Sequence, residues 1–163
     1  MAIQVAYFHS PIGWLEIRAS KKGITHIDYV ESKGEHFNRT PLLKKCKDQL
    51  QEYFERKRKV FNLPLDLDGT DFQVIVWKEI KKIPYGTTIT YQDLSHRLGD
   101  PHSERAVGHA NSKNPINIVI PCHRVIASDG KLTGYRGGLK RKKWLLDFEG
   151  AFAQMDLFAL MDT

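Results

Sequence analysis

The residues best suited to covalent chemistry are Cys122, His123 and Arg124, which follow one another in the string Pro-Cys-His-Arg. Cysteine reacts as the thiolate, and neighbouring positive charge lowers the pKa of a thiol. We therefore expect His123 and Arg124 to make Cys122 a nucleophile. The alternative is that Cys122 is a small buried hydrophobic residue, which is the more common role for a cysteine in a Cys-His pair taken by itself.

The flanking residues predict how this cysteine is held. The apolar run at residues 118–120 predicts a buried strand or extended segment, and Pro121 restricts the backbone just before the thiol. The next apolar pair, residues 125–126, predicts a return to the core, and Ser-Asp-Gly at residues 128–130 predicts a turn. We expect the chain to reach the surface at residues 122–124.

Strings on both sides of the cysteine resemble the active-site region of one family. They are Asn-Pro at 114–115, residues 118–126, Gly-Tyr-Arg-Gly-Gly-Leu at 134–139, Trp-Leu-Leu at 144–146 and Glu-Gly at 149–150. Together they resemble the methylguanine-DNA methyltransferases, also called alkylguanine-DNA alkyltransferases, which repair DNA by direct reversal. The Pro-Cys-His-Arg core is highly specific for that family.

The resemblance implies a mechanism for Cys122. A methyl or larger alkyl group would move once, irreversibly, from O6 of a guanine flipped out of double-stranded DNA to the cysteine sulfur. His123 would take the thiol proton through a water, and Glu149 would orient the imidazole. Tyr135 would donate to the departing O6, and Asn114 would brace the active-site turn. No metal and no cofactor is expected, because the protein itself accepts the alkyl group.

Residues 70–150 predict a mostly helical part that contains a helix-turn-helix. Thr70 is the expected N-cap of a first helix. The apolar stripe of that helix consists of Phe72, Val76, Trp77 and Ile80. Two short helices follow, with Thr90 and Ser103 as N-caps and a turn at residues 99–102 between them.

The resemblance implies that these two short helices bind DNA through the minor groove. Arg105 would fill the gap left by the flipped base, and Tyr91 would contact the phosphate of the target nucleotide. Small residues on the second short helix would permit a close approach, either of DNA or of a neighbouring helix. The remaining residues expected at the DNA are Ala106, Gly108, Ala110, Arg124, Ser128 and Gly137.

Residues 1–69 predict a separate N-terminal α+β domain. Three alternating apolar stretches separated by turn residues predict a β-meander within the first 35 residues. Thr40-Pro41 then begins an amphipathic helix whose apolar stripe includes Cys46, so we expect Cys46 to serve packing. The resemblance implies a ribonuclease H-like fold for this domain. The second domain, residues 70–163, would carry DNA binding and alkyl transfer, and its tail beyond Gly150 is expected to pack as a helix.

Composition sets broad limits on function. The chain of 163 residues has a formal net charge of +6, which is compatible with a polyanionic partner. The basic runs at residues 44–47, 56–59 and 140–143 are interpreted as solvated surfaces, with nucleic-acid contact as the alternative. Two widely separated cysteines and the lack of a long apolar run favour an intracellular, cytoplasmic protein without a membrane span. The protein is also expected to be a monomer.

Two other classes of function remain open at this stage. One is a DNA-lesion binding module without chemistry, as in the alkyltransferase-like proteins, in which the cysteine is replaced; Cys122 argues against it. The other is a thiol hydrolase, for which the sequence shows no matching local signature.

Overall fold

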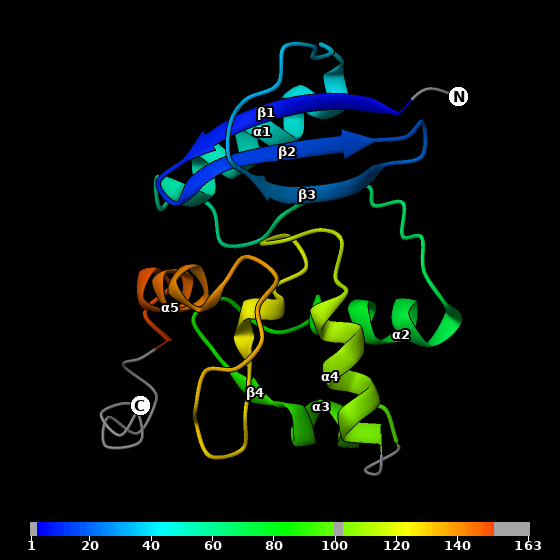
Figure 1. Cartoon of the computed structure of the whole chain (residues 1–163), viewed down its shortest axis with the longest axis vertical. Coiled ribbons are helices and arrows are strands. Elements are labelled where there is room, and N and C mark those ends of the chain that lie inside the picture. Colours follow the sequence, from blue (N-terminus) through cyan, green and yellow to red (C-terminus); the bar gives the residue numbers. More distant parts are fainter. Residues whose placement is uncertain (1–2, 100–102, 152–163) are drawn as a thin grey trace. The chain divides into compact units, whose positions relative to one another are not determined.

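The computed structural model describes residues 3–99 and 103–151 (Figure 1). The chain divides into two compact units. The first comprises the residues up to Asp68 together with Pro115–Asn117, and the second comprises Gly69–Asn114 and the residues from Ile118 onward. The mixed α+β class predicted from the sequence is confirmed. Residues 100–102 of the expected turn and residues 152–163 of the tail lie outside the described residues.

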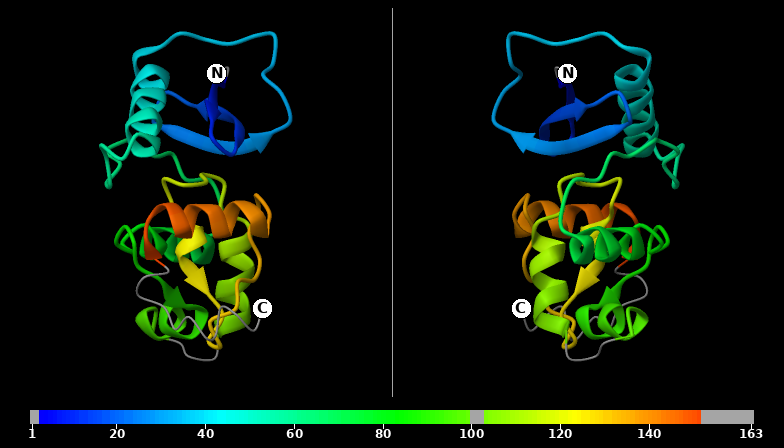
Figure 2. Two further views of the ribbon diagram at one scale, coloured as in Figure 1. Left: turned by 90° about the vertical axis from the view of Figure 1, so that its left-hand side faces the viewer. Right: turned by 90° about the vertical axis from the view of Figure 1, so that its right-hand side faces the viewer.

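The first unit is an antiparallel meander covered by one helix (Figures 1 and 2). Its elements are β1 (Gln4–Ser10), β2 (Gly13–Ala19), β3 (Ile24–Val30) and α1 (Pro41–Phe54). The predicted start of this helix at Thr40-Pro41 is confirmed, and the hydroxyl of Thr40 caps it by accepting a hydrogen bond from the backbone N–H of Leu43. Alternate residues of β2, such as Leu15 and Ile17, are fully buried, which gives the sheet one apolar face.

Helix α1 lies on the sheet through the apolar stripe that the sequence predicted. Cys46 and Leu50 on this stripe are fully buried, and the rings of Phe8 and Phe54 stack at 6.1 Å. Burial raises the pKa of the Cys46 thiol to about 12, so this cysteine stays protonated. Its position confirms a packing role.

A short segment of distant sequence completes the first unit. Residues Pro115–Asn117 lie beside β3, where Ile116 forms a parallel bridge with Ile27. The backbone N–H of Ile27 donates to the carbonyl of Pro115 at 3.0 Å, and the backbone N–H and side-chain amide of Asn117 donate to the carbonyl of Ile27 at 3.1 and 2.8 Å. The sequence did not predict this excursion of the chain.

Among its described residues the second unit contains four α-helices, a single-turn 3₁₀ helix and two short parallel strands. These elements are α2 (Asp71–Ile80), β4 (Ile89–Thr90), α3 (Tyr91–Arg97), α4 (Glu104–Ser112), the single-turn 3₁₀ helix η2 (Cys122–Arg124), β5 (Val125–Ile126) and α5 (Leu139–Phe148). Thr70 and Thr90 are N-caps, as predicted, and both form capping boxes. Ser103 occupies the N-cap position of α4 but makes no capping hydrogen bond with its side chain.

Helix α2 anchors the core of this unit. The indole N–H of Trp77 donates to the carbonyl of Ala110 in α4 at 2.8 Å, and both residues are buried. The predicted apolar stripe is confirmed for Val76, Trp77 and Ile80 but is wrong for Phe72, which is 38% exposed. Phe72 lies in the first turn of the helix, one turn before the first buried residue, Val76.

Residues 118–120 are buried, as expected, but they form a turn and not a strand. The backbone of Ile118 adopts φ of 73°, a left-handed conformation that is rare for a β-branched residue. The chain therefore reverses direction immediately before Pro121, and the reversal presents Cys122 at the start of η2.

Candidate active site and DNA-binding surface

The turn before Cys122 is held by hydrogen bonds inside the core. The side-chain amide of the fully buried Asn114 donates to the carbonyl of Ile120 at 2.8 Å, and the backbone N–H of Cys122 donates to the same carbonyl at 2.8 Å. Asn114 also hydrogen-bonds the thiol of Cys122. Asn114 therefore links the turn to the sulfur of Cys122, and its bracing role in the reaction stays a prediction.

The chain does not reach the surface at residues 122–124, contrary to expectation. Cys122 is 2% exposed, His123 is fully buried and Arg124 is 5% exposed. The apolar run before η2 and the strand β5 after it are both buried, so the 3₁₀ turn between them stays inside the unit.

Glu149 joins two of these residues. Its carboxylate contacts Nε2 of His123 at 2.9 Å and accepts hydrogen bonds from Nε and Nη2 of Arg124 at 2.8 and 2.9 Å. The remaining bond of the guanidinium goes from Nη1 to the carbonyl of Ile83 at 2.7 Å. Arg124, which we expected at the DNA, is instead an internal ion-pair partner. Because its donors face the carboxylate and a carbonyl, it offers no contact to DNA in this structure.

Burial keeps the imidazole of His123 neutral, and the carboxylate sets which ring nitrogen carries the proton. Burial lowers the pKa of His123, although Glu149 acts in the opposite direction, so the ring is neutral at pH 7. A neutral ring facing a carboxylate carries its proton on Nε2 and donates it, which leaves Nδ1 with an unshared electron pair. Nδ1 is buried and has no hydrogen-bond partner among the described residues. The site thus contains a base whose accepting nitrogen lacks a hydrogen-bond partner among the described residues.

The thiol is protonated in this closed site. Burial raises the pKa of Cys122 to about 11, and the hydrogen bond of Asn114 and the positive charges of Lys142 and Arg136 oppose this only in part. The expectation that His123 and Arg124 lower the pKa is wrong, because His123 is neutral and the charge of Arg124 is balanced by Glu149. Chemistry at this sulfur therefore requires a base to remove its proton.

Lys142 is a residue of the site that the sequence did not reveal. It lies in the basic run at residues 140–143 but is fully buried, and its Nζ donates to the carbonyls of Val125 at 2.7 Å and Thr133 at 2.6 Å. Burial lowers its pKa to about 8, and its charge interacts with Cys122. Helical periodicity was the available signal, because Lys142 lies three and four residues before the buried Leu145 and Leu146.

Two tyrosines predicted for the site lie beside it. The ring of Tyr135 is nearly buried and meets the ring of His123 edge to face, with centroids 6.4 Å apart. The hydroxyl of Tyr91 donates to the carbonyl of Thr133 at 3.3 Å, and Nζ of Lys142 lies 6.0 Å from the ring centroid. Burial raises the pKa of Tyr91, so its hydroxyl remains a donor.

The structure brings three of the predicted DNA-binding residues together. Tyr91 from α3 and Arg105 and Gly108 from α4 line one hollow of about 380 Å³, together with Glu104. A β-carbon in place of Gly108 would lie 3.8 Å from the ring of Tyr91, which is an ordinary contact distance. Ala106 and Ser128 are exposed and Gly137 is half-buried. Ala110 is buried against Trp77, so it cannot contact DNA as expected.

Comparison with known proteins decides the family. Residues 3–67 match the model of the ribonuclease-like domain of 6-O-methylguanine DNA methyltransferase, and residues 71–151 match the model of its DNA-binding domain. The chain belongs to the 6-O-methylguanine DNA methyltransferase family. The ribonuclease-like character expected for the N-terminal part agrees with the first of these matches.

Individual relatives support this assignment over nearly the whole chain. The methylated-DNA–protein-cysteine methyltransferase of Methanosarcina barkeri is 44% identical over 146 residues, which are 86% of this chain and 92% of the relative. The crystal structure of the Mycobacterium tuberculosis O6-methylguanine methyltransferase superposes with a TM-score of 0.82 at 41% identity, covering 98% of this chain and 99% of that one. A structure of the M. tuberculosis protein in complex with DNA gives a TM-score of 0.80 at 43% identity, covering 89% and 92%.

Two searches of the described residues gave negative results. Within residues 3–99 and 103–151, no three histidine, cysteine or acidic side chains are grouped as a metal site would require. In the same ranges no helix is long and apolar enough to cross a membrane.

Proposed function

We propose that this protein repairs DNA by moving a methyl or larger alkyl group from O6 of guanine to the sulfur of Cys122, once per molecule. The single observation that supports it best is the arrangement of Cys122, His123 and Glu149 in a chain that belongs to this family. The new carbon–sulfur bond is a thioether, which water does not cleave under cellular conditions, so the protein is consumed in the reaction.

The proton of the thiol leaves through His123. A water between the sulfur and Nδ1 of His123 would satisfy the one ring nitrogen that lacks a partner among the described residues. As the thiolate forms, the imidazole becomes charged, and the carboxylate of Glu149 at 2.9 Å stabilises that charge. The thiolate then attacks the alkyl carbon in line with the bond to O6, and the electron pair of that bond goes to the guanine.

The departing guanine needs a proton or a hydrogen bond at O6. Tyr135 is the proposed donor, and its ring contact with His123 supports this because it places the phenol in the same cluster as the base. Since Cys122 is 2% exposed, the flipped guanine must displace neighbouring side chains before its alkyl group reaches the sulfur.

The surface of α3 and α4 is the proposed DNA interface. Arg105 is exposed and lies next to Tyr91 around one hollow, which suits an arginine that enters the duplex where the guanine has left. The contact would be through the minor groove, made by one molecule, and independent of sequence. A cytoplasmic site of action is proposed, and the free thiols of Cys46 and Cys122 support a reducing compartment.

Intact-protein mass spectrometry tests the proposal. The protein is incubated with a duplex containing one O6-methylguanine, and we expect a gain of one methyl group per chain. Cys122→Ala should show no gain, whereas Cys46→Ala, which removes the other buried cysteine, should still gain the methyl group.

Each alternative has its own result in this assay. Tight binding without any mass gain would replace the proposal with a lesion-binding module. Repeated hydrolysis of an ester would replace it with a thiol hydrolase. A methyl gain that persists in Cys122→Ala would refute the assignment of the nucleophile.

A further inference from the structure

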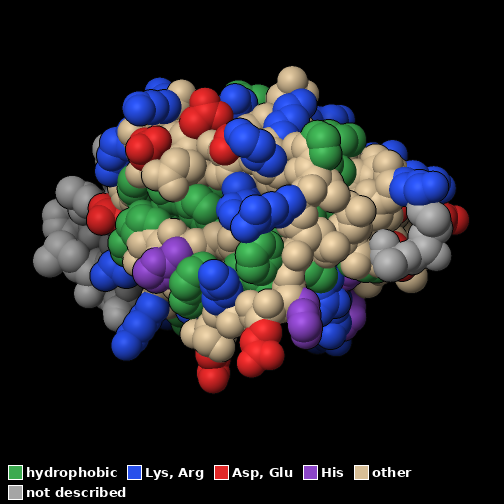
Figure 3. Space-filling model, turned by 90° about the horizontal axis from the view of Figure 1, so that it is seen from above, with side chains coloured by type: hydrophobic (Ala, Val, Ile, Leu, Met, Phe, Trp, Pro, Cys, Tyr) green, Lys and Arg blue, Asp and Glu red, His purple; other side chains and the backbone are tan. Residues whose placement is uncertain are grey.

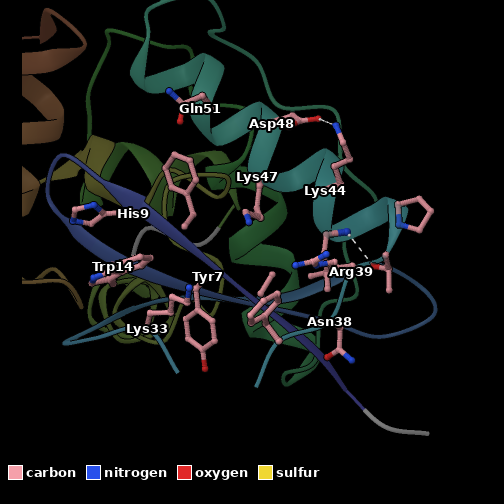
Figure 4. Close-up of a pocket in the computed structure, with 16 residues that line it drawn as sticks. Tyr7, His9, Trp14, Lys33, Asn38, Arg39, Lys44, Lys47, Asp48 and Gln51 are labelled. Atoms are coloured by element: carbon pink, nitrogen blue, oxygen red, sulfur yellow. Dashed lines mark hydrogen bonds and ion pairs between the residues drawn. The ribbon is translucent and has the colours of Figure 1, made fainter. Parts of the chain in front are cut away.

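A large cavity in the first unit has no part in the proposed reaction. It has a volume of about 1100 Å³ and is lined by β1, by α1, by Trp14 of β2 and by the segment between β3 and α1 (Figure 4). All of its lining residues belong to the first unit. Its size lies at the upper end of the range for small-molecule sites, roughly 300–1,000 Å³.

The lining of the cavity is largely apolar, but most of its charged side chains are positive. Four cations, Lys33, Arg39, Lys44 and Lys47, face one carboxylate, Asp48. Lys44 is paired with Asp48 at 2.7 Å, while Lys33, Arg39 and Lys47 form no ion pair with any described residue. Figure 4 shows Lys47 extending from α1 and Arg39 extending from the segment before it. In the space-filling view from above (Figure 3), Lys and Arg side chains lie among hydrophobic ones. The occupant should therefore carry several negative charges.

Aromatic rings lie among these cations. The rings of His9 and Trp14 stack on each other with centroids 4.5 Å apart, at neighbouring positions of β1 and β2 (Figure 4). Phe37 is 46% exposed, and Nζ of Lys33 and the guanidinium of Arg39 each lie 5.5 Å from its ring centroid. A large exposed ring flanked by two cations can stack on a flat group while the cations contact adjoining anions.

We propose that this cavity binds an unpaired strand of nucleic acid. Bases would stack on Phe37 and on the ring pair at Trp14, and phosphates would contact Arg39, Lys33 and Lys47. A single nucleotide would leave much of the volume empty, which favours a strand of several nucleotides.

The main alternative occupant is an acidic peptide added to the edge of β1. Asn38 already occupies part of that edge: its backbone N–H donates to the carbonyl of Val5 at 2.7 Å, and its side-chain oxygen accepts from the N–H of Val5 at 2.9 Å. An added strand could therefore pair only beyond Val5. This shortening of the free edge favours nucleic acid over a peptide.

The test uses the full chain and a fluorescein-labelled oligothymidine of about eight nucleotides. Phe37→Ala should weaken binding by about 5- to 100-fold, the effect of losing one stacking contact. Lys47→Glu should weaken binding and reduce the slope of log K against log salt by about 0.7. The matched control is Lys45→Glu, since Lys45 is exposed on the same helix but does not line the cavity.

A second readout locates the bound strand. In ¹H–¹⁵N spectra, the oligonucleotide should shift the indole signal of Trp14 and the amide signals of Phe37 and Lys47. Equal weakening by Lys45→Glu and Lys47→Glu, or shifts confined to the second unit, would overturn the proposal. If thymidine monophosphate at equal nucleotide concentration, or an acidic peptide, displaces the oligothymidine, the occupant is not a strand of nucleic acid.

Methyl transfer provides an independent check on these variants. Phe37→Ala and Lys47→Glu should accept methyl groups from the modified duplex as the wild type does, because neither residue belongs to the unit that carries Cys122. If the wild type accepts methyl groups but does not bind the oligothymidine, this inference is refuted and the proposed function stands.

Discussion

Replacing Glu149 by glutamine should leave a buried guanidinium without its counter-charge. The carboxylate side chain is fully buried and accepts two hydrogen bonds from Arg124, at 2.8 and 2.9 Å, besides its contact with His123 at 2.9 Å. Removing one partner of a buried ion pair costs about 3–5 kcal/mol. For a protein of this size such a loss lowers the melting temperature by about 6–20 °C.

A double-mutant cycle separates the lost charge pairing from a general disturbance of the core. Arg124→Met alone should cost a similar amount, about 3–5 kcal/mol, because it leaves the carboxylate unpaired. Glu149→Gln combined with Arg124→Met should cost about 2–3 kcal/mol less than the sum of the two single changes, since no buried charge is left alone. The measurement is urea unfolding, with the midpoint lowered and the m-value unchanged. If the destabilisation of the double variant equals the sum of the two single variants, the loss of the ion pair is not its cause.

The same carboxylate predicts a pH dependence. Burial alone would raise the pKa of Glu149, but His123 and Arg124 hold it well below its ordinary value. A group whose pKa is lower in the folded state stabilises the protein above its unfolded pKa, about 4.3, and that stability is lost as the pH falls. The wild type should therefore lose stability below about pH 4.3 more steeply than Glu149→Gln. If the stability of the wild type and of Glu149→Gln falls equally with pH, Glu149 is not the group responsible.

Three further predictions concern the second unit. Lys142→Met removes a charge that lowers the pKa of Cys122. Methyl transfer at neutral pH should therefore slow by about tenfold for each unit by which the pKa of Cys122 rises. The variant should approach the rate of the wild type at alkaline pH, and an equal slowing at every pH would contradict the charge effect. Arg105→Ala should reduce the salt slope of duplex binding by about 0.9 without changing stability, because Arg105 is exposed; titrations at several salt concentrations would show this. Trp77→Phe loses the hydrogen bond to the carbonyl of Ala110 at 2.8 Å. The free energy of unfolding in urea should fall by about 1–3 kcal/mol, and an unchanged midpoint would mean that the carbonyl finds another donor.

Features that depend on nearby residues could be predicted from the sequence. The capping boxes at Thr70 and Thr90 need only a hydroxyl and a polar side chain three residues later, and both are present. The meander likewise follows from alternation and turn residues in adjoining segments. The packing role of Cys46 follows from its place on an amphipathic helix.

Features that depend on tertiary packing could not be predicted. The turn at Ile118 uses a backbone conformation that its own side chain disfavours, so local preference indicated a strand. Charge indicated an exposed Lys142, yet the carbonyls that bind its Nζ come from distant positions, Val125 and Thr133. The burial of Cys122 could not be predicted either. A reactive cysteine and an inert one are the same residue in a sequence, and only their folded surroundings distinguish them.

The excursion of residues Pro115–Asn117 into the first unit has a consequence during synthesis on the ribosome. Ile27 of the first unit cannot pair with Ile116 until about fifty residues beyond Asp68 have been translated. Until then the backbone of β3 at Ile27 is an open edge that can recruit another chain. A fragment that stops at Asp68 would keep that edge permanently, and it should self-associate more strongly than the complete chain.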